Sequence, residues 1–156
     1  MRPKMKIENL MNKDDIWNAV TSVLSEHDLS TENNKTDETF LAFQYYSEME
    51  SGGHESLLNS LEWYIEEIGI DHYLKNLIGV LEKIEAYDYA AIVKNNCEEL
   101  WTLYIALEND EIEEEKFYHL IEKADTDYHK LGDQLETLLE AYFVTIHTEL
   151  IEVVED

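Results

Sequence analysis

Apolar residues recur at helical spacing along almost the whole chain, and the only proline is Pro3. Intervals of three and four residues place apolar side chains on one face of an α-helix. Proline lacks a backbone N–H and clashes with the preceding turn, so nothing after position 3 blocks a helix in this way. No segment alternates apolar and polar residues as a half-buried strand does. The sequence therefore predicts an all-α fold.

Breaks in the spacing predict about eight helices of unequal length. Two of them are expected at Tyr87–Asn95 and Leu100–Leu107, separated by a short polar stretch. The last helix has the most regular apolar stripe, which runs from Leu131 to Leu150. With 156 residues, of which 44% are hydrophobic, the chain is long enough to bury one core. We expect a single compact multi-helix domain.

Negative charge is the most unusual property of the composition. The chain has 36 Asp and Glu against 11 Lys and Arg, a net charge of −25. Four basic residues stand in the first 13 positions, and from Asp14 onward 35 acidic residues face 7 basic ones, a net charge of −28. We therefore divide the chain into a basic N-terminal segment, 1–13, and a single acidic helical domain, 14–156. The basic segment is a candidate for a flexible tail.

Such a charge narrows the classes of partner. Direct binding of nucleic acid is disfavoured because the phosphates would be repelled, and anionic membranes are disfavoured for the same reason. Cationic partners remain, namely a basic protein surface or metal ions. A high net charge also serves solubility, which is the alternative explanation, although self-repulsion destabilises a compact domain.

Cysteine usage and the N-terminus indicate where the protein works. With Cys97 as its single cysteine the chain can form no intrachain disulfide, which favours a reducing compartment. The first 15 residues lack the apolar region of a secretory signal. No run approaches the roughly 18 apolar residues of a membrane span. We expect a cytoplasmic protein.

Enzymatic and metal-binding motifs are absent or incomplete. His119 and Glu122 have i, i+3 spacing, but no second such pair completes a di-metal site. Residues 125–136 resemble a calcium loop in their acids, yet Lys130 stands where the loop needs glycine. Carboxylates beside Cys97 would raise the pKa of its thiol. Glycine-rich phosphate loops and nucleophile elbows do not occur. We expect no enzyme, no cofactor and no metal.

Rows of acids one helical turn apart are the better candidates for a site, because their Cβ atoms would lie roughly 5–6 Å apart, comparable to phosphates along a DNA strand. Residues 108–115 hold six acids in eight positions, a repulsive arrangement that suggests the charge is needed. A solvated helix start is the alternative. The candidate partner-binding acids are Glu62, Glu66, Glu67, Glu108, Asp110, Glu111, Glu113, Glu114 and Glu115.

A glycine pair interrupts the helical spacing in "EMESGGHESLLNS", residues 48–60. This stretch resembles the motif of a family of small acidic helical proteins known through a DNA-mimic protein: a glutamate, three residues, two glycines and, after five more residues, an asparagine. The resemblance covers about residues 37–147. His54, Ser51 and Ser56 depart from the family's usual phenylalanine, asparagine and glutamine. The matching positions are Glu48, Gly52, Gly53, Leu57, Leu58, Asn59 and the Ile68–Gly69 corner.

The resemblance implies a non-enzymatic protein that imitates the DNA phosphate backbone and occupies the DNA-binding surface of a transcription factor or another basic protein. An immunity or antitoxin protein that neutralises a basic toxin is the alternative, and a homodimer is compatible with either. At the corner itself, Gly52 and Gly53 would let the chain leave one helix with φ > 0 and enter the next. We expect Glu48 and Asn59 to hydrogen-bond the backbone exposed there.

Overall fold

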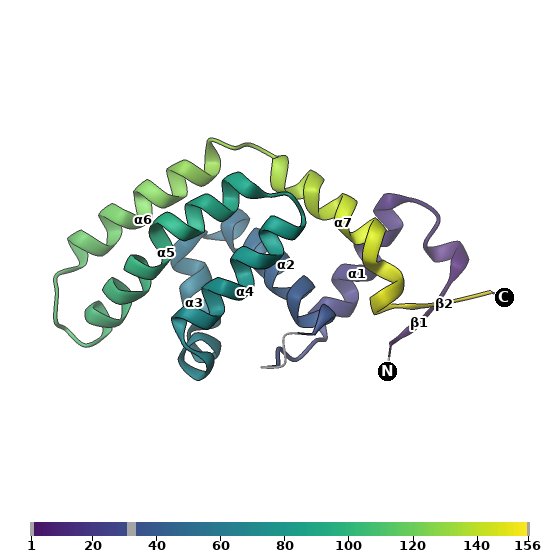
Figure 1. Cartoon of the computed structure of the whole chain (residues 1–156), viewed down its shortest axis with the longest axis horizontal. Helices are drawn as coiled ribbons and strands as arrows, with labels where there is room; N and C mark the ends of the chain where they lie inside the picture. Colours follow the sequence, from purple (N-terminus) through teal and green to yellow (C-terminus); the bar gives the residue numbers. More distant parts are fainter. Residues whose placement is uncertain (1, 31–33, 156) are drawn as a thin grey trace.

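The computed structural model describes residues 2–30 and 34–155. Seven α-helices make up most of this part of the chain. The all-α prediction is confirmed (Figure 1). Buried side chains of the helices form one hydrophobic core. The elements are β1 (Lys4–Lys6), a short 3-10 turn (Ile7–Asn9), α1 (Lys13–Ser25), α2 (Lys35–Ser51), α3 (Gly53–Ile68), α4 (Ile70–Lys83), α5 (Tyr87–Glu108), α6 (Glu114–His129), α7 (Gln134–Leu150) and β2 (Glu152–Val154).

The prediction of about eight helices is one too many, because the segments expected at Tyr87–Asn95 and Leu100–Leu107 form the single helix α5. The polar stretch between them stays helical because Asn96 is satisfied inside the protein. Its side-chain amide donates to the Ile92 carbonyl at 2.9 Å, and its side-chain oxygen accepts from Lys123 Nζ on α6 at 3.2 Å. Polar residues therefore did not mark a break in this helix.

Helix α2 lies at the centre of the fold and contacts α1, α3, α4 and α7, while α5 packs between α4 and α6. Asp37, in the first turn of α2, is fully buried. Burial opposes the ionisation of its carboxyl most strongly, but hydrogen bonds from Ser30, His27 and Asn34 outweigh burial and lower the pKa. The buried carboxylate thereby ties the segment before α2 to the start of the helix.

The two ends of the chain meet in a small sheet that the sequence did not predict. Strand β1 pairs in parallel with β2, with Lys4 opposite Glu152 and Lys6 opposite Val154. Figure 1 shows both termini at the same end of the molecule, beside α1 and α7. Each strand has only three residues, which is too short for a recognisable alternation of apolar and polar positions.

Candidate functional site

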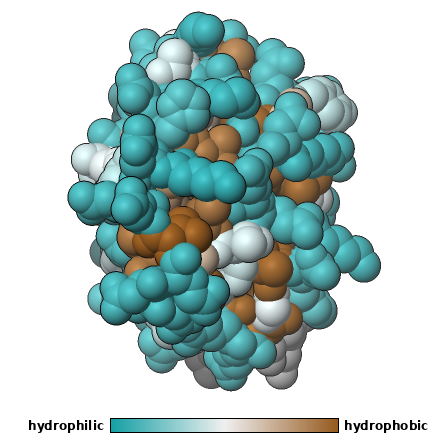
Figure 2. Space-filling view, turned by 90° about the vertical axis from the view of Figure 1, so that its left-hand side faces the viewer, coloured by the Kyte–Doolittle hydropathy of each residue, from teal (hydrophilic) through white to brown (hydrophobic). Residues whose placement is uncertain are grey.

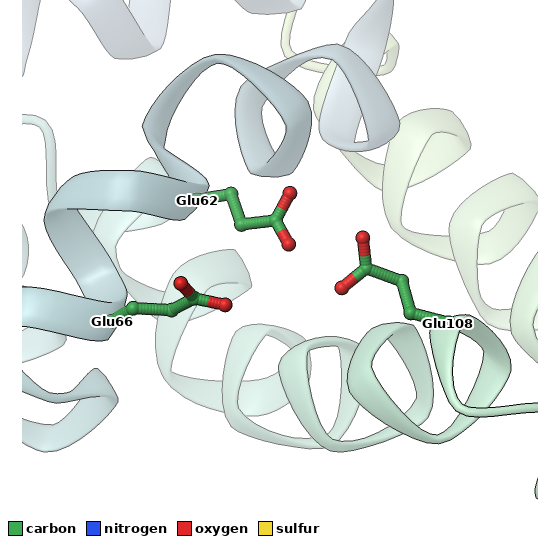
Figure 3. A group of neighbouring side chains, drawn as sticks. All are labelled: Glu62, Glu66 and Glu108. Atoms are coloured by element: carbon green, nitrogen blue, oxygen red, sulfur yellow. The ribbon is translucent and has the colours of Figure 1, made fainter.

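Three of the predicted acidic residues converge in space. Glu62 and Glu66 stand one turn apart on α3, and Glu108 is the last residue of α5. One carboxylate oxygen from each lies within 4.8 Å of the other two. Figure 3 shows the three side chains pointing toward one another from the two helices. We call Glu62, Glu66 and Glu108 the acidic triad.

A side-chain contact between α5 and α3 explains this convergence. Leu61 and Ile65 of α3 face the core, which leaves Glu62 half-buried and Glu66 exposed on the flank of the helix. Tyr104 of α5 reaches the same flank, where its hydroxyl lies 2.9 Å from Asn59 Oδ1 and 3.1 Å from Glu62 Oε1. Glu108 follows Tyr104 by one turn and therefore meets the two α3 carboxylates.

Among the ion pairs formed by the described part of the chain, none includes a triad carboxylate. The pKa of Glu108 is raised, first by a hydrogen bond shared with Glu62, then by desolvation and by repulsion from Glu62 and Glu66. The triad also adjoins the C-terminus of α5, whose helix dipole is negative there. An external cation would relieve this repulsion.

The remaining predicted acids extend the surface away from the triad. Asp110, Glu111 and Glu113 lie in the connection between α5 and α6, and Glu114 and Glu115 begin α6. All five are exposed. Because this connection starts directly after Glu108, it continues the acidic surface from the triad to the start of α6. Glu67 is also exposed on α3 but does not belong to the triad.

The glycine pair forms the corner between α2 and α3. Gly53 has φ +76°, a conformation that residues with a Cβ atom rarely adopt. A Cβ on Gly53 would also lie 2.5 Å from Asp125 Oδ2 of α6. Gly53 is therefore required for two reasons, its backbone conformation and the close approach of a carboxylate.

The expected roles of Glu48 and Asn59 at this corner need correction, because both bind side chains and not the backbone. Glu48 accepts hydrogen bonds from Gln44 and Ser56. Asn59 points outward from α3, and its hydrogen bond joins it to Tyr104.

Asp125, 71 residues along the chain from His54, binds the corner backbone instead. Its Oδ1 lies 2.9 Å from the backbone nitrogen of His54 and 2.6 Å from the buried His54 Nδ1. One feature of the sequence points to this contact: a histidine occupies the position where phenylalanine is usual, and a histidine needs a polar partner once it is buried.

Cys97 and the pair His119 and Glu122 were the residues that the sequence offered for catalysis and for a metal ion. Cys97 is buried, and desolvation raises the pKa of its thiol to about 12, so the thiol is protonated at neutral pH. The sequence predicted a raised pKa for this thiol because of neighbouring carboxylates, whereas in the structure the cause is burial. His119 and Glu122 are exposed on α6. The triad is a group that can hold a metal ion, but three carboxylates supply only part of the six to eight oxygen ligands that calcium takes.

Among the described residues, no helix is both long and apolar enough to cross a lipid bilayer. Comparison with protein-family models gives a match to the DMP19-like protein family over residues 33–147, well over half of the chain. The chain belongs to the DMP19-like protein family. This is a DNA-mimic family, as the motif around Gly52 and Gly53 indicated. Searches among curated proteins and among solved structures each gave no significant match.

Both the glycine corner and the acidic triad lie within the part of the chain that matches the DMP19-like family. The matched range also contains the whole connection between α5 and α6. Helix α1, the last three residues of α7 and strands β1 and β2 lie outside it. The family match therefore concerns the acidic helical part of the molecule and not the small sheet at the termini.

Proposed function

We propose that this protein is a non-enzymatic DNA mimic that binds the DNA-binding surface of a basic protein, such as a transcription factor. The observation that carries the proposal is the acidic triad, in which three carboxylate oxygens lie within 4.8 Å of one another without a cation from the described chain. Membership in a DNA-mimic family supports the same function.

The geometry of the triad suits a partner that normally binds phosphates. DNA carries one negative charge per 1.7 Å of helix axis, and proteins bind it with lysine and arginine side chains. Glu62, Glu66 and Glu108 present a comparable local density of charge on a fixed scaffold. Because the three residues stand on α3 and α5, these helices fix the backbone positions from which the carboxylates reach a cationic partner. Regulation of transcription in the cytoplasm would follow if the partner is a transcription factor.

Affinity capture tests this proposal. The full-length protein is immobilised, cell extract is applied at low salt, and proteins eluted by rising salt are identified by mass spectrometry. We expect a basic DNA-binding protein whose binding to the immobilised chain is competed by duplex DNA. Recovery of no basic protein would refute the proposal. A basic protein that does not bind DNA would favour the toxin-neutralising alternative.

Two matched variants identify which charges bind the captured protein. Glu62→Gln, Glu66→Gln and Glu108→Gln together remove the triad charges, whereas Asp88→Asn, Glu98→Gln and Glu99→Gln together remove three exposed charges elsewhere. The captured protein should elute at lower salt from the triad variant and at nearly unchanged salt from the control variant. Equal shifts for both would show that net charge alone, and not the triad, determines binding.

A further inference from the structure

An open hollow with an apolar component lies within the acidic surface. It has a volume of about 520 Å³ and is lined by Ile112, Glu113, Glu115, Lys116 and His119, from the end of the α5–α6 connection and the start of α6. Figure 2 looks onto this end of the molecule and shows hydrophobic side chains exposed among hydrophilic ones. The volume falls within the range of about 300–1,000 Å³ that is typical of ligand-binding pockets.

Ile112 is the aliphatic residue of this hollow. Its side chain is half-buried and packs against the core, so its exposed part is held in place. A surface that imitates only phosphates gains nothing from an apolar hollow, because phosphate groups are charged and polar and have no apolar surface to bury. The position of Ile112 among six acids in residues 108–115 thus indicates a partner that is both cationic and apolar.

We propose that the hollow at Ile112 binds an aliphatic side chain of the basic partner, flanked by lysine or arginine residues that pair with the surrounding carboxylates. This inference rests on the proposed function, since it concerns the same partner. Charge complementarity selects the occupant: Lys116 is the one basic residue beside these six acids in the stretch 108–116, so the local charge attracts a basic segment. The aliphatic contact adds a component of binding that salt does not screen.

Two synthetic peptides test this proposal on the intact protein: a capped Lys-Arg-Leu-Arg-Lys and the matched Lys-Arg-Ser-Arg-Lys. Affinities are measured calorimetrically at low salt and again at about 0.5 M NaCl, where exposed ion pairs are screened. We expect the leucine peptide to bind roughly tenfold more tightly than the serine peptide at both salt concentrations, as burial of one leucine side chain predicts. Equal affinities of the two peptides would overturn the proposal.

Variants and chemical shifts locate the contact. Ile112→Ser should abolish the preference for leucine, whereas Ile7→Ser, which changes an exposed isoleucine outside the acidic surface, should preserve it. Glu113→Gln combined with Glu115→Gln should lower the affinity for both peptides equally at low salt. In the wild-type protein, the leucine peptide should shift the amide resonances of residues 112–119 more strongly than the serine peptide does, with the largest difference at Ile112. Shifts elsewhere would overturn the proposal even if Ile112→Ser fails to fold.

The outcomes separate this inference from the proposed function. Salt-sensitive binding of both peptides without a preference for leucine would overturn the hollow as a binding site and leave DNA mimicry standing. Absence of binding by either peptide, together with no captured DNA-binding protein, would refute both.

Discussion

Asp125 on α6 receives two hydrogen bonds from His54 at the start of α3, one from the backbone nitrogen at 2.9 Å and one from Nδ1 at 2.6 Å. Because His54 is 1% exposed, loss of this carboxylate would leave a buried ring nitrogen without a partner. We expect Asp125→Ala to lower the free energy of unfolding by about 1–3 kcal/mol, measured by urea denaturation.

Asp127→Ala is the control for that change, because Asp127 lies two residues away on α6 and makes only an exposed i, i+4 ion pair with Lys123 at 3.6 Å. Such pairs contribute about 0.3–0.5 kcal/mol. Equal destabilisation by the two variants would contradict the structural role of Asp125.

Gly53 should tolerate no side chain, whereas Gly79 should. Gly53→Ala places a Cβ 2.5 Å from the Asp125 carboxylate at φ +76°, and we expect a loss of about 2–4 kcal/mol. Gly79 lies inside α4 with open space around it, so Gly79→Ala should stabilise the protein by up to about 1 kcal/mol. Thermal denaturation of both variants tests this, and a Gly53→Ala protein as stable as wild type would contradict the corner geometry.

Gly53 and Asp125 show which features of the fold the sequence alone can predict and which it cannot. A glycine pair interrupting a helical pattern predicted a corner, because only local conformation was involved. The partner of that corner, Asp125, comes from another helix, and no local pattern shows which helices will pack together. The continuity of α5 was missed for a similar reason, since Asn96 is stabilised by Lys123 of a different helix.

Glu108→Gln should stabilise the protein at neutral pH. The pKa of Glu108 is raised in the folded state above its ordinary value of 4.5, so its ionised form is less favourable there than in the unfolded chain. This destabilisation is fully present above the folded-state pKa and absent below about pH 4.5. Melting temperatures should therefore show a small gain for Glu108→Gln at pH 7 that disappears toward pH 4. Glu99→Gln, on an exposed position of the same helix, controls for the loss of one charge. A gain independent of pH would show that repulsion in the triad is not its cause.

Asp37→Asn should have the opposite effect. The pKa of Asp37 is lowered below its ordinary value of 3.8, so its stabilising contribution is present above about pH 3.8 and is lost as pH falls through the folded-state pKa. We expect Asp37→Asn to reduce the free energy of unfolding by about 1–3 kcal/mol at pH 7, with a smaller difference in acid. Denaturation at pH 7 and near pH 3, beside the exposed-site control Asp71→Asn, measures this. A difference that grows in acid would be inconsistent with an ionised Asp37.

The acidic surface was predictable in its members but not in its arrangement. Helical spacing identified Glu62 and Glu66 as neighbours, and the run from Glu108 to Glu115 was visible as a cluster of charge. Their meeting depends on Tyr104, which joins α5 to α3 through Asn59 and Glu62. Contacts between residues more than 40 positions apart require the fold.

Competition with DNA tests the central claim most directly. A DNA-binding protein recovered by affinity capture is bound to fluorescent duplex DNA, and fluorescence anisotropy follows its release as this protein is added. We predict full displacement by the wild-type protein. Displacement should need roughly tenfold more of the triad variant, because each of the three lost charge pairs contributes about 0.5 kcal/mol to binding. The matched control variant should displace the DNA at the same concentration as the wild-type protein. Simultaneous binding of this protein and DNA to the partner would contradict the account.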